Sequence, residues 1–202
     1  MGYCHMFYGV DLKRIQALFG SNDTAYVDKL IAGIGDELKG NDAFFADAID
    51  EGTCPSSEQA LRHIVAGTIT GANAEAMYGY VLKIICEHEG EMLNGEVYAI
   101  RDHPYASKLV ASGPPIPIPD DAGDFPEIGY LALEDIDGEI ERIDRAPQRA
   151  RRSLALTVLK WATRGMLRLQ MSDEEAVEDM AAYRESLVEA KEKGYSIVSF
   201  RH

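Results

Sequence analysis

Apolar residues recur at helical spacing through residues 12–90. The clearest run repeats every three to four positions and covers a wide face. It consists of Ala74, Met77, Tyr78, Val81, Leu82, Ile85 and Cys86. Gly90 follows as a predicted helix end. Because a helix with so wide an apolar face is usually central to a core, we expect the segment from Ala74 to Cys86 to be buried.

Shorter helical patterns precede this run. Asp11 is a predicted N-cap for a helix over Leu12–Phe19, and a second helical pattern covers residues 27–38. A short helix over Asp42–Asp50 would carry Phe44, Phe45 and Ile49. Ser56 and Gln59 have the spacing of a capping box, and Gly67 is placed to end the helix that they begin.

Strands are predicted near both ends of the chain. Tyr3–Val10 is rich in aromatic and β-favouring residues, and Tyr195–Phe200 is predicted as the last strand. Shorter strands are expected at Glu96–Ile100 and Ile128–Leu133. Further helices are predicted at residues 104–113, 134–143, 147–169 and 172–190. The sequence therefore predicts one α+β domain over residues 1–202, in which helices, the majority of the structure, cover a small, mostly antiparallel sheet that includes both terminal strands.

The composition, 46% hydrophobic and 27% charged, is that of an ordinary globular protein. No apolar stretch approaches the roughly 20 residues that span a bilayer, and the N-terminus does not resemble a signal peptide. The three cysteines are odd in number and far apart, which argues against a secreted disulfide scaffold. We expect a cytoplasmic protein that does not enter a membrane.

The net charge of −14 is unevenly distributed. Residues 145–171 contain seven basic and no acidic residues, so this predicted helix attracts the acidic remainder within or between molecules. The predicted contacts to a partner protein, or to a second copy of the chain, are Arg149, Arg152, Arg164 and Arg168. The acidic remainder disfavours nucleic acid, and Trp161 is the only aromatic residue among the arginines that could stack on bases.

Several fragments resemble a known family when they are taken together and in order. They are YGVDL (Tyr8–Leu12), YGYVLKIIC (Tyr78–Cys86), PPIPIP and DFPEIGYL within residues 114–131, and GYSIVSFRH (Gly194–His202). The chain resembles an uncharacterised family of bacterial single-domain proteins, catalogued as a domain of unknown function. The resemblance implies a compact bacterial cytoplasmic protein, and it transfers no activity and no catalytic residue.

Sequence motifs indicate no catalytic constellation. The chain lacks the phosphate-binding loops, the serine-hydrolase elbow and the cysteine and histidine spacings of zinc sites. Residues 133–144 partly follow a calcium loop, but Leu133 occupies the first ligand position. Cys86 lies on the apolar helix face and is expected to be a buried thiol, while Cys4 and His5 point to opposite faces of a strand. We expect no metal and no cofactor, and we assign no catalytic residue.

Two functional hypotheses follow. The first is a non-enzymatic, immunity-like or accessory protein of the bacterial cytoplasm that binds another protein, which the acidic composition and the lack of a catalytic motif suggest. The alternative is an enzyme or a small-ligand-binding protein with a cleft bordered by the proline-rich segment 114–126. The predicted ligand contacts in that cleft are Tyr78, Tyr80, Asp124 and Tyr130.

Overall fold

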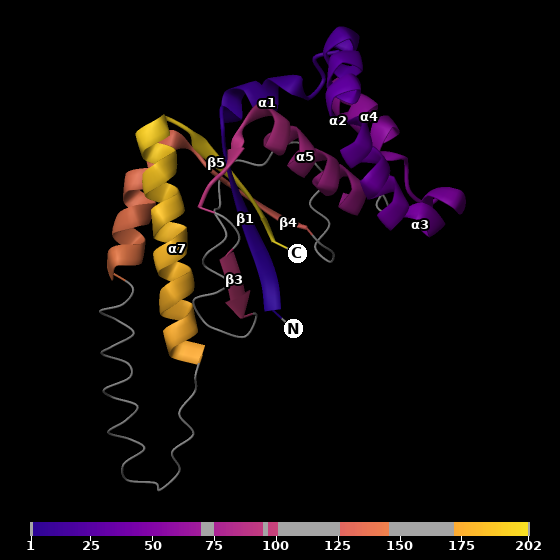
Figure 1. Ribbon diagram of the computed structural model, residues 1–202. Coiled ribbons are helices and arrows are strands. Elements are labelled where there is room, and N and C mark those ends of the chain that lie inside the picture. Colours follow the sequence, from indigo (N-terminus) through magenta and orange to yellow (C-terminus); the bar gives the residue numbers. More distant parts are fainter. Residues whose placement is uncertain (1, 70–74, 95–96, 101–125, 146–171, 202) are drawn as a thin grey trace, which may run out of the picture.

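The computed structural model describes residues 2–69, 75–94, 97–100, 126–145 and 172–201 (Figure 1). Its helices are α1 (Leu12–Leu18), α2 (Thr24–Phe44), α3 (Ala46–Asp50), α4 (Ser57–Ala66), α5 (Glu75–Glu89), a helix at residues 136–145 and α7 (Ser172–Lys193). Its strands are β1 (Gly2–Val10), β2 (Glu91–Met92), β3 (Val97–Ile100), β4 (Glu127–Leu131) and β5 (Ser196–Arg201). The predicted α+β class is confirmed.

The strands form a single antiparallel sheet. Its order is β2-β1-β5-β4, and β3 also pairs with β1. The register of β1 and β5 runs from His5 opposite Arg201 to Val10 opposite Ser196. The first and last strands therefore lie side by side within the sheet, as the sequence predicts.

One face of the sheet packs against α1 and α5, and α2 and α4 pack in turn on α5. Tyr8 of β1 and Phe200 of β5 point to this side, and their rings meet edge to face at 5.7 Å. The apolar run of α5 is buried here, with Leu82 and Cys86 fully inaccessible to solvent. Burying one such leucine contributes about 2 kcal/mol. The predicted burial of the central helix is confirmed.

Glycines allow α5 to lie close to the sheet. A Cβ atom at Gly79 would sit 2.8 Å from the ring of Pro126, just before β4. A Cβ atom at Gly90 would overlap the backbone oxygen of Gly9 in β1. Side chains at either position would push the helix away from the strands, so a close helix–sheet contact requires glycine there.

The other face packs against α7 and the 136–145 helix, which stand together on the opposite side of the sheet from α5 (Figure 1). Side chains alternate along a strand, so Phe7 points to this side while its neighbour Tyr8 points to the other. The rings of Phe7 and Tyr183 are stacked at 4.9 Å. The Tyr183 hydroxyl donates a hydrogen bond to Glu139 at 3.1 Å, which connects α7 to the 136–145 helix.

Local signals at the helix ends are confirmed. The Ser56 side chain accepts from the backbone of Gln59, the Gln59 side chain accepts from the backbone of Ser56, and Gly67 ends α4 with a positive φ of 67°. Asp11 caps α1 as predicted. The helix predicted over residues 42–50 is different: α2 continues through Phe44 and breaks at Phe45 before α3 begins.

Other predictions differ from the structure or fall outside it. The strand predicted to reach Leu133 ends at Leu131, because Leu133–Asp135 forms a 3-10 turn whose first backbone N–H bonds to Ser196. The helices predicted at residues 104–113 and 147–169 lie outside the described residues. Assignment of the chain to one domain stays a prediction. Among the described helices, none has the length and apolarity to span a membrane.

Candidate functional site

Three of the four predicted ligand contacts lie among the described residues. Tyr78 of α5 is buried in the core, and its hydroxyl lies 3.0 Å from Nδ1 of His63. Tyr130 is buried in the same core cluster. Tyr80 is half-buried and contacts aromatic side chains at the end of α2 instead. Asp124 lies outside the described residues.

The partner contacts predicted on the basic segment also fall outside the structure. Arg149, Arg152, Arg164 and Arg168 belong to residues 146–171, which the structure does not describe. Their proposed role stays a prediction. Two other groups of described residues are candidate sites, an exposed aromatic group and a buried polar group.

The aromatic group consists of Phe44, Phe45 and Tyr80. The rings of Phe44 and Phe45 meet edge to face at 4.9 Å, and Phe45 meets Tyr80 in the same way at 5.4 Å. Phe44 completes the group at 6.1 Å from Tyr80. Phe44 is nevertheless 73% exposed, the most exposed of the large apolar side chains described. Edge-to-face pairs hold the inner rings as a platform beneath an uncovered ring.

The helix break explains how this ring comes to be exposed. Phe45 leaves helical geometry with φ −102° and ψ 17°, so the chain turns from α2 into α3 at that residue. Phe45 then turns toward α5 and Tyr80, while Phe44 remains on the outside. Burial raises the pKa of Tyr80, so its phenol is neutral at pH 7. In Figure 1, α3 lies at the outer edge of the molecule, far from α7.

Exposed acidic residues follow this aromatic group in the sequence. The chain contains no Lys or Arg between residues 40 and 61, and Asp47, Asp50 and Glu51 are exposed. Lys39 lies before this stretch and is paired with Asp36 at 3.0 Å. We call Phe44, Phe45 and Tyr80, with Asp47, Asp50 and Glu51, the acidic aromatic face.

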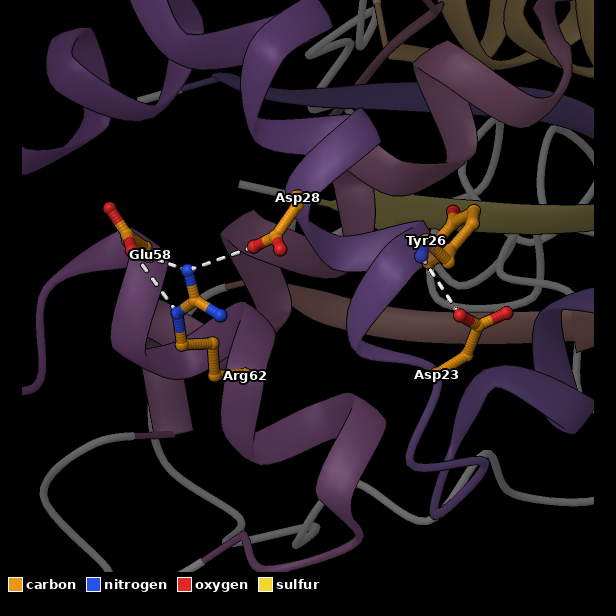
Figure 2. A network of polar contacts seen from close by, with 5 residues as sticks. All are labelled: Asp23, Tyr26, Asp28, Glu58 and Arg62. Carbon is orange, nitrogen blue, oxygen red and sulfur yellow. Dashed lines mark hydrogen bonds and ion pairs between the residues drawn. The ribbon is translucent and has the colours of Figure 1, made fainter.

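Arg62, the first basic residue after this stretch, is already engaged. Its guanidinium lies 2.9 Å from Glu58, one turn earlier on α4, and 3.3 Å from Asp28 of α2 (Figure 2). Beside this network, Asp23 caps α2 by accepting from the backbone N–H of Tyr26 at 2.9 Å (Figure 2). Because Arg62 is paired with two carboxylates, its charge is largely balanced locally and the acidic aromatic face keeps its negative character.

A second unusual group is buried on the α7 face of the sheet. His5 is fully inaccessible to solvent, and Ser199 and Arg201 of β5 are also buried. Neither ring nitrogen of His5, nor Oγ of Ser199, has a hydrogen-bond partner within the described parts of the chain. An unsatisfied buried polar group costs about 1–3 kcal/mol. We call His5, Ser199 and Arg201 the buried polar cluster.

Burial sets the charge state of His5. Desolvation first, and the nearby positive charge of Arg201 second, lower the pKa of His5 to about 4. The imidazole is therefore neutral at pH 7, with one nitrogen that donates and one that accepts. Buried hydroxyls on the opposite face are satisfied: Tyr8 donates to Glu87 at 2.7 Å, and Tyr26 donates to Glu89 at 3.0 Å.

Sequence reasoning missed both groups. For the buried polar cluster, a signal exists in the alternation of the terminal strands, since His5 shares a face with Phe7 while Ser199 and Arg201 share one with Ile197. The sequence analysis applied this alternation only to separate His5 from Cys4. For the aromatic face, adjacent phenylalanines in an acidic stretch were visible, but helical spacing does not tell which ring is buried.

The other candidate chemistries give no site in the part of the chain that is described. Those residues contain no group of three or more His, Cys, Asp or Glu able to hold a metal ion. Cys86 is fully buried and its pKa is raised by desolvation, as expected for an unreactive thiol. Cys54 is buried and its pKa is also raised by desolvation.

Comparison with known proteins identifies the family without a function. The family model described as a domain of unknown function (DUF7691) matches residues 1–202. The chain belongs to the DUF7691 family. The predicted membership in a family of unknown function is therefore confirmed. No curated protein and no solved structure matches the chain, so functional inference for this DUF7691 protein depends on its own residues.

Proposed function

We propose that this protein is a non-enzymatic interaction protein that binds a basic segment of another protein through the acidic aromatic face. The observation that carries the proposal is Phe44, whose ring is 73% exposed although two further aromatic rings support it from beneath. Aromatic residues on a supported platform are the residues that most often anchor protein interfaces.

The apolar part of the face supplies binding energy. Covering a phenylalanine ring contributes about 2 kcal/mol. Phe45 and Tyr80 are already partly buried and packed together, so little side-chain freedom is lost when a partner covers them. An apolar side chain of the partner that packs against Phe44 would cover the exposed side of this ring.

The charged part of the face selects the partner. Asp47, Asp50 and Glu51 would attract lysines or arginines and repel acidic segments, and this steering raises the association rate more than the final affinity. The occupant that fits both parts is an amphipathic segment with one aromatic or aliphatic anchor and several basic residues. A bacterial cytoplasmic accessory or immunity-like role is the setting that we propose for such binding.

The chain itself contains one sequence of this chemistry, the basic segment at residues 145–171. Pairing of that segment with the acidic aromatic face of a second copy is the competing outcome. Sedimentation velocity over a range of protein and salt concentrations separates the two. A monomer at all concentrations supports a different protein as the partner, whereas a dimer that Phe44→Ser abolishes would replace the proposed partner by a second copy.

The chemistry of the partner can be tested with three synthetic peptides. The first carries lysines on one helix face and a tryptophan and leucines on the other, the second keeps the lysines but replaces the apolar residues with serine, and the third reverses the charges. We expect fluorescence anisotropy to show clear binding of the first, weaker binding of the second and none of the third, with affinity falling as salt rises. Equal binding of the first two peptides would contradict an aromatic contact.

The alternative, a ligand cleft bordered by residues 114–126, stays a prediction. Tyr78 and Tyr130 are buried in the core, and residues 114–125 lie outside the described part. On the other face of the sheet, His5 and Ser199 of the buried polar cluster are interior groups with no hydrogen-bond partner in the described residues. A small-molecule function would be sought there.

A further inference from the structure

We propose that the buried polar cluster is an internal site for a small inorganic anion of about the size of chloride, held between His5, Ser199 and Arg201. This inference is independent of the acidic aromatic face, since the two groups lie on different elements. It assigns a ligand class to His5 and Ser199, whose polar side-chain atoms have no hydrogen-bond partner in the described residues.

Strand register places the three side chains together. His5 is directly opposite Arg201, and Ser199 is opposite Phe7, two residues further along β1. Cβ atoms of directly opposite residues are about 5 Å apart, and diagonal neighbours are about 7–8 Å apart, distances at which three side chains on one face can surround a single small atom. The His5 and Phe7 ring centroids, 6.2 Å apart, place His5 beside the stacked Phe7–Tyr183 pair.

The chemistry of the cluster favours an anion. Neutral His5 supplies an N–H donor and Ser199 an O–H donor, and neither group has a hydrogen-bond partner in the described residues. Arg201 adds a positive charge in the same place and also takes part in other interactions, so its contribution to the site is its charge. A metal cation would be repelled by Arg201, whereas an anion is attracted by the guanidinium and accepts from both donors.

Burial limits the size of the ligand. His5 and Ser199 are almost wholly inaccessible, and Phe7 and Tyr183 beside them are packed into the second core cluster. A monatomic anion could be enclosed in the interior during folding or local opening, whereas a large organic ligand would require the core to separate. A buried water is the competing occupant, because it also accepts and donates at polar sites.

Two measurements on the full chain test the site. Crystals grown with bromide in place of chloride should show an anomalous bromide peak next to Ser199 Oγ and the His5 ring. In solution, the melting temperature should rise with chloride concentration when ionic strength is held constant with gluconate, since a ligand of the folded state stabilises it. Ser199→Ala should remove most of that chloride-dependent rise.

Ser186→Ala is the matched control, because Ser186 is also buried on the α7 side but its hydroxyl already donates to the Ala182 carbonyl at 3.2 Å. It should keep the chloride-dependent rise. The proposal is overturned by water alone at the cluster in the bromide crystal. It is equally overturned by an adventitious ion only, that is, a bromide peak without any effect of chloride on the melting temperature. Loss of the chloride-dependent rise in both Ser199→Ala and Ser186→Ala would also overturn it. The bromide crystal uses the unaltered chain, so the test does not depend on how Ser199→Ala folds.

Discussion

The acidic aromatic face and the buried polar cluster are opposite exceptions to the rule that apolar side chains are buried and polar side chains are exposed. The first leaves a large apolar ring, Phe44, in solvent, and the second places His5, Ser199 and Arg201 where a core would take apolar residues. Exposed apolar groups and buried polar groups are the informative exceptions in a folded protein, and such local conflicts concentrate at functional sites. The acidic aromatic face therefore suits a large partner, and the buried polar cluster suits a small ligand.

The two departures also differ in energetic cost. An exposed ring costs the folded state little, since it is solvated much as it would be in the unfolded chain. A buried polar group without a hydrogen bond lowers the free energy of unfolding whenever no ligand satisfies it. Substitutions should therefore have different effects on stability at the two places.

Acidification should give the largest effect. The pKa of His5 is about 4 in the folded protein and about 6.5 in an unfolded chain, so the unfolded state binds a proton first as the pH falls. Stability that is present above about pH 6.5 is then lost progressively down to about pH 4. In chloride-free buffer, the decrease in unfolding free energy between pH 7 and pH 4.5 should be about 2 kcal/mol larger for the wild type than for His5→Leu.

Urea unfolding at the two pH values measures this difference, and the carboxylates that titrate in the same range contribute equally to both proteins. Parallel losses in the wild type and in His5→Leu would show that His5 is not held neutral by the folded state.

Removal of polar groups from the two faces of the sheet should give effects of opposite sign. In chloride-free buffer at pH 7, His5→Leu should raise the free energy of unfolding by about 1 kcal/mol, because it removes a buried group with no hydrogen-bond partner in the described structure. Tyr78→Phe should lower it by about 1 kcal/mol, because it removes the hydroxyl that pairs with His63. Urea unfolding midpoints, with unchanged slopes, provide the measurement. Destabilisation by both substitutions would contradict the expected difference in sign between the two faces of the sheet.

The smallest effect on stability is expected at Phe44. Phe44→Ser should change the free energy of unfolding by less than about 0.5 kcal/mol, because most of the ring is already in solvent. Thermal unfolding followed by circular dichroism measures this, with Met92→Ser as the comparison, since Met92 is 47% exposed on β2. A loss well above that of Met92→Ser would mean that the ring serves the fold rather than a partner.

Local features of the fold were predictable from the sequence. The apolar period of α5 predicted its burial, and the Ser56 and Gln59 spacing predicted the start of α4. The content of aromatic and β-favouring residues predicted the terminal strands. Each of these is encoded within one turn of helix or within a few residues of strand.

The two candidate sites depend on contacts that local patterns do not contain. Phe44 is exposed because the chain breaks at Phe45, and periodicity predicted one continuous helix there. The buried polar cluster depends on the β1–β5 register, which joins His5 to Arg201 across nearly the whole chain. The predicted grouping of Tyr78, Tyr80 and Tyr130 did not use the orientation of each ring. Tyr78 of α5 and Tyr130 of β4 are buried in the core, whereas Tyr80 of α5 contacts Phe45.

The most direct test of partner binding at the acidic aromatic face is the affinity of Phe44→Ser for the basic amphipathic peptide, relative to Met92→Ser. If the face binds the peptide, Phe44→Ser should lose about tenfold or more in affinity, corresponding to about 1.4 kcal/mol, and Met92→Ser should keep the dissociation constant unchanged. Equal affinities for the wild type and both variants would contradict binding at this face.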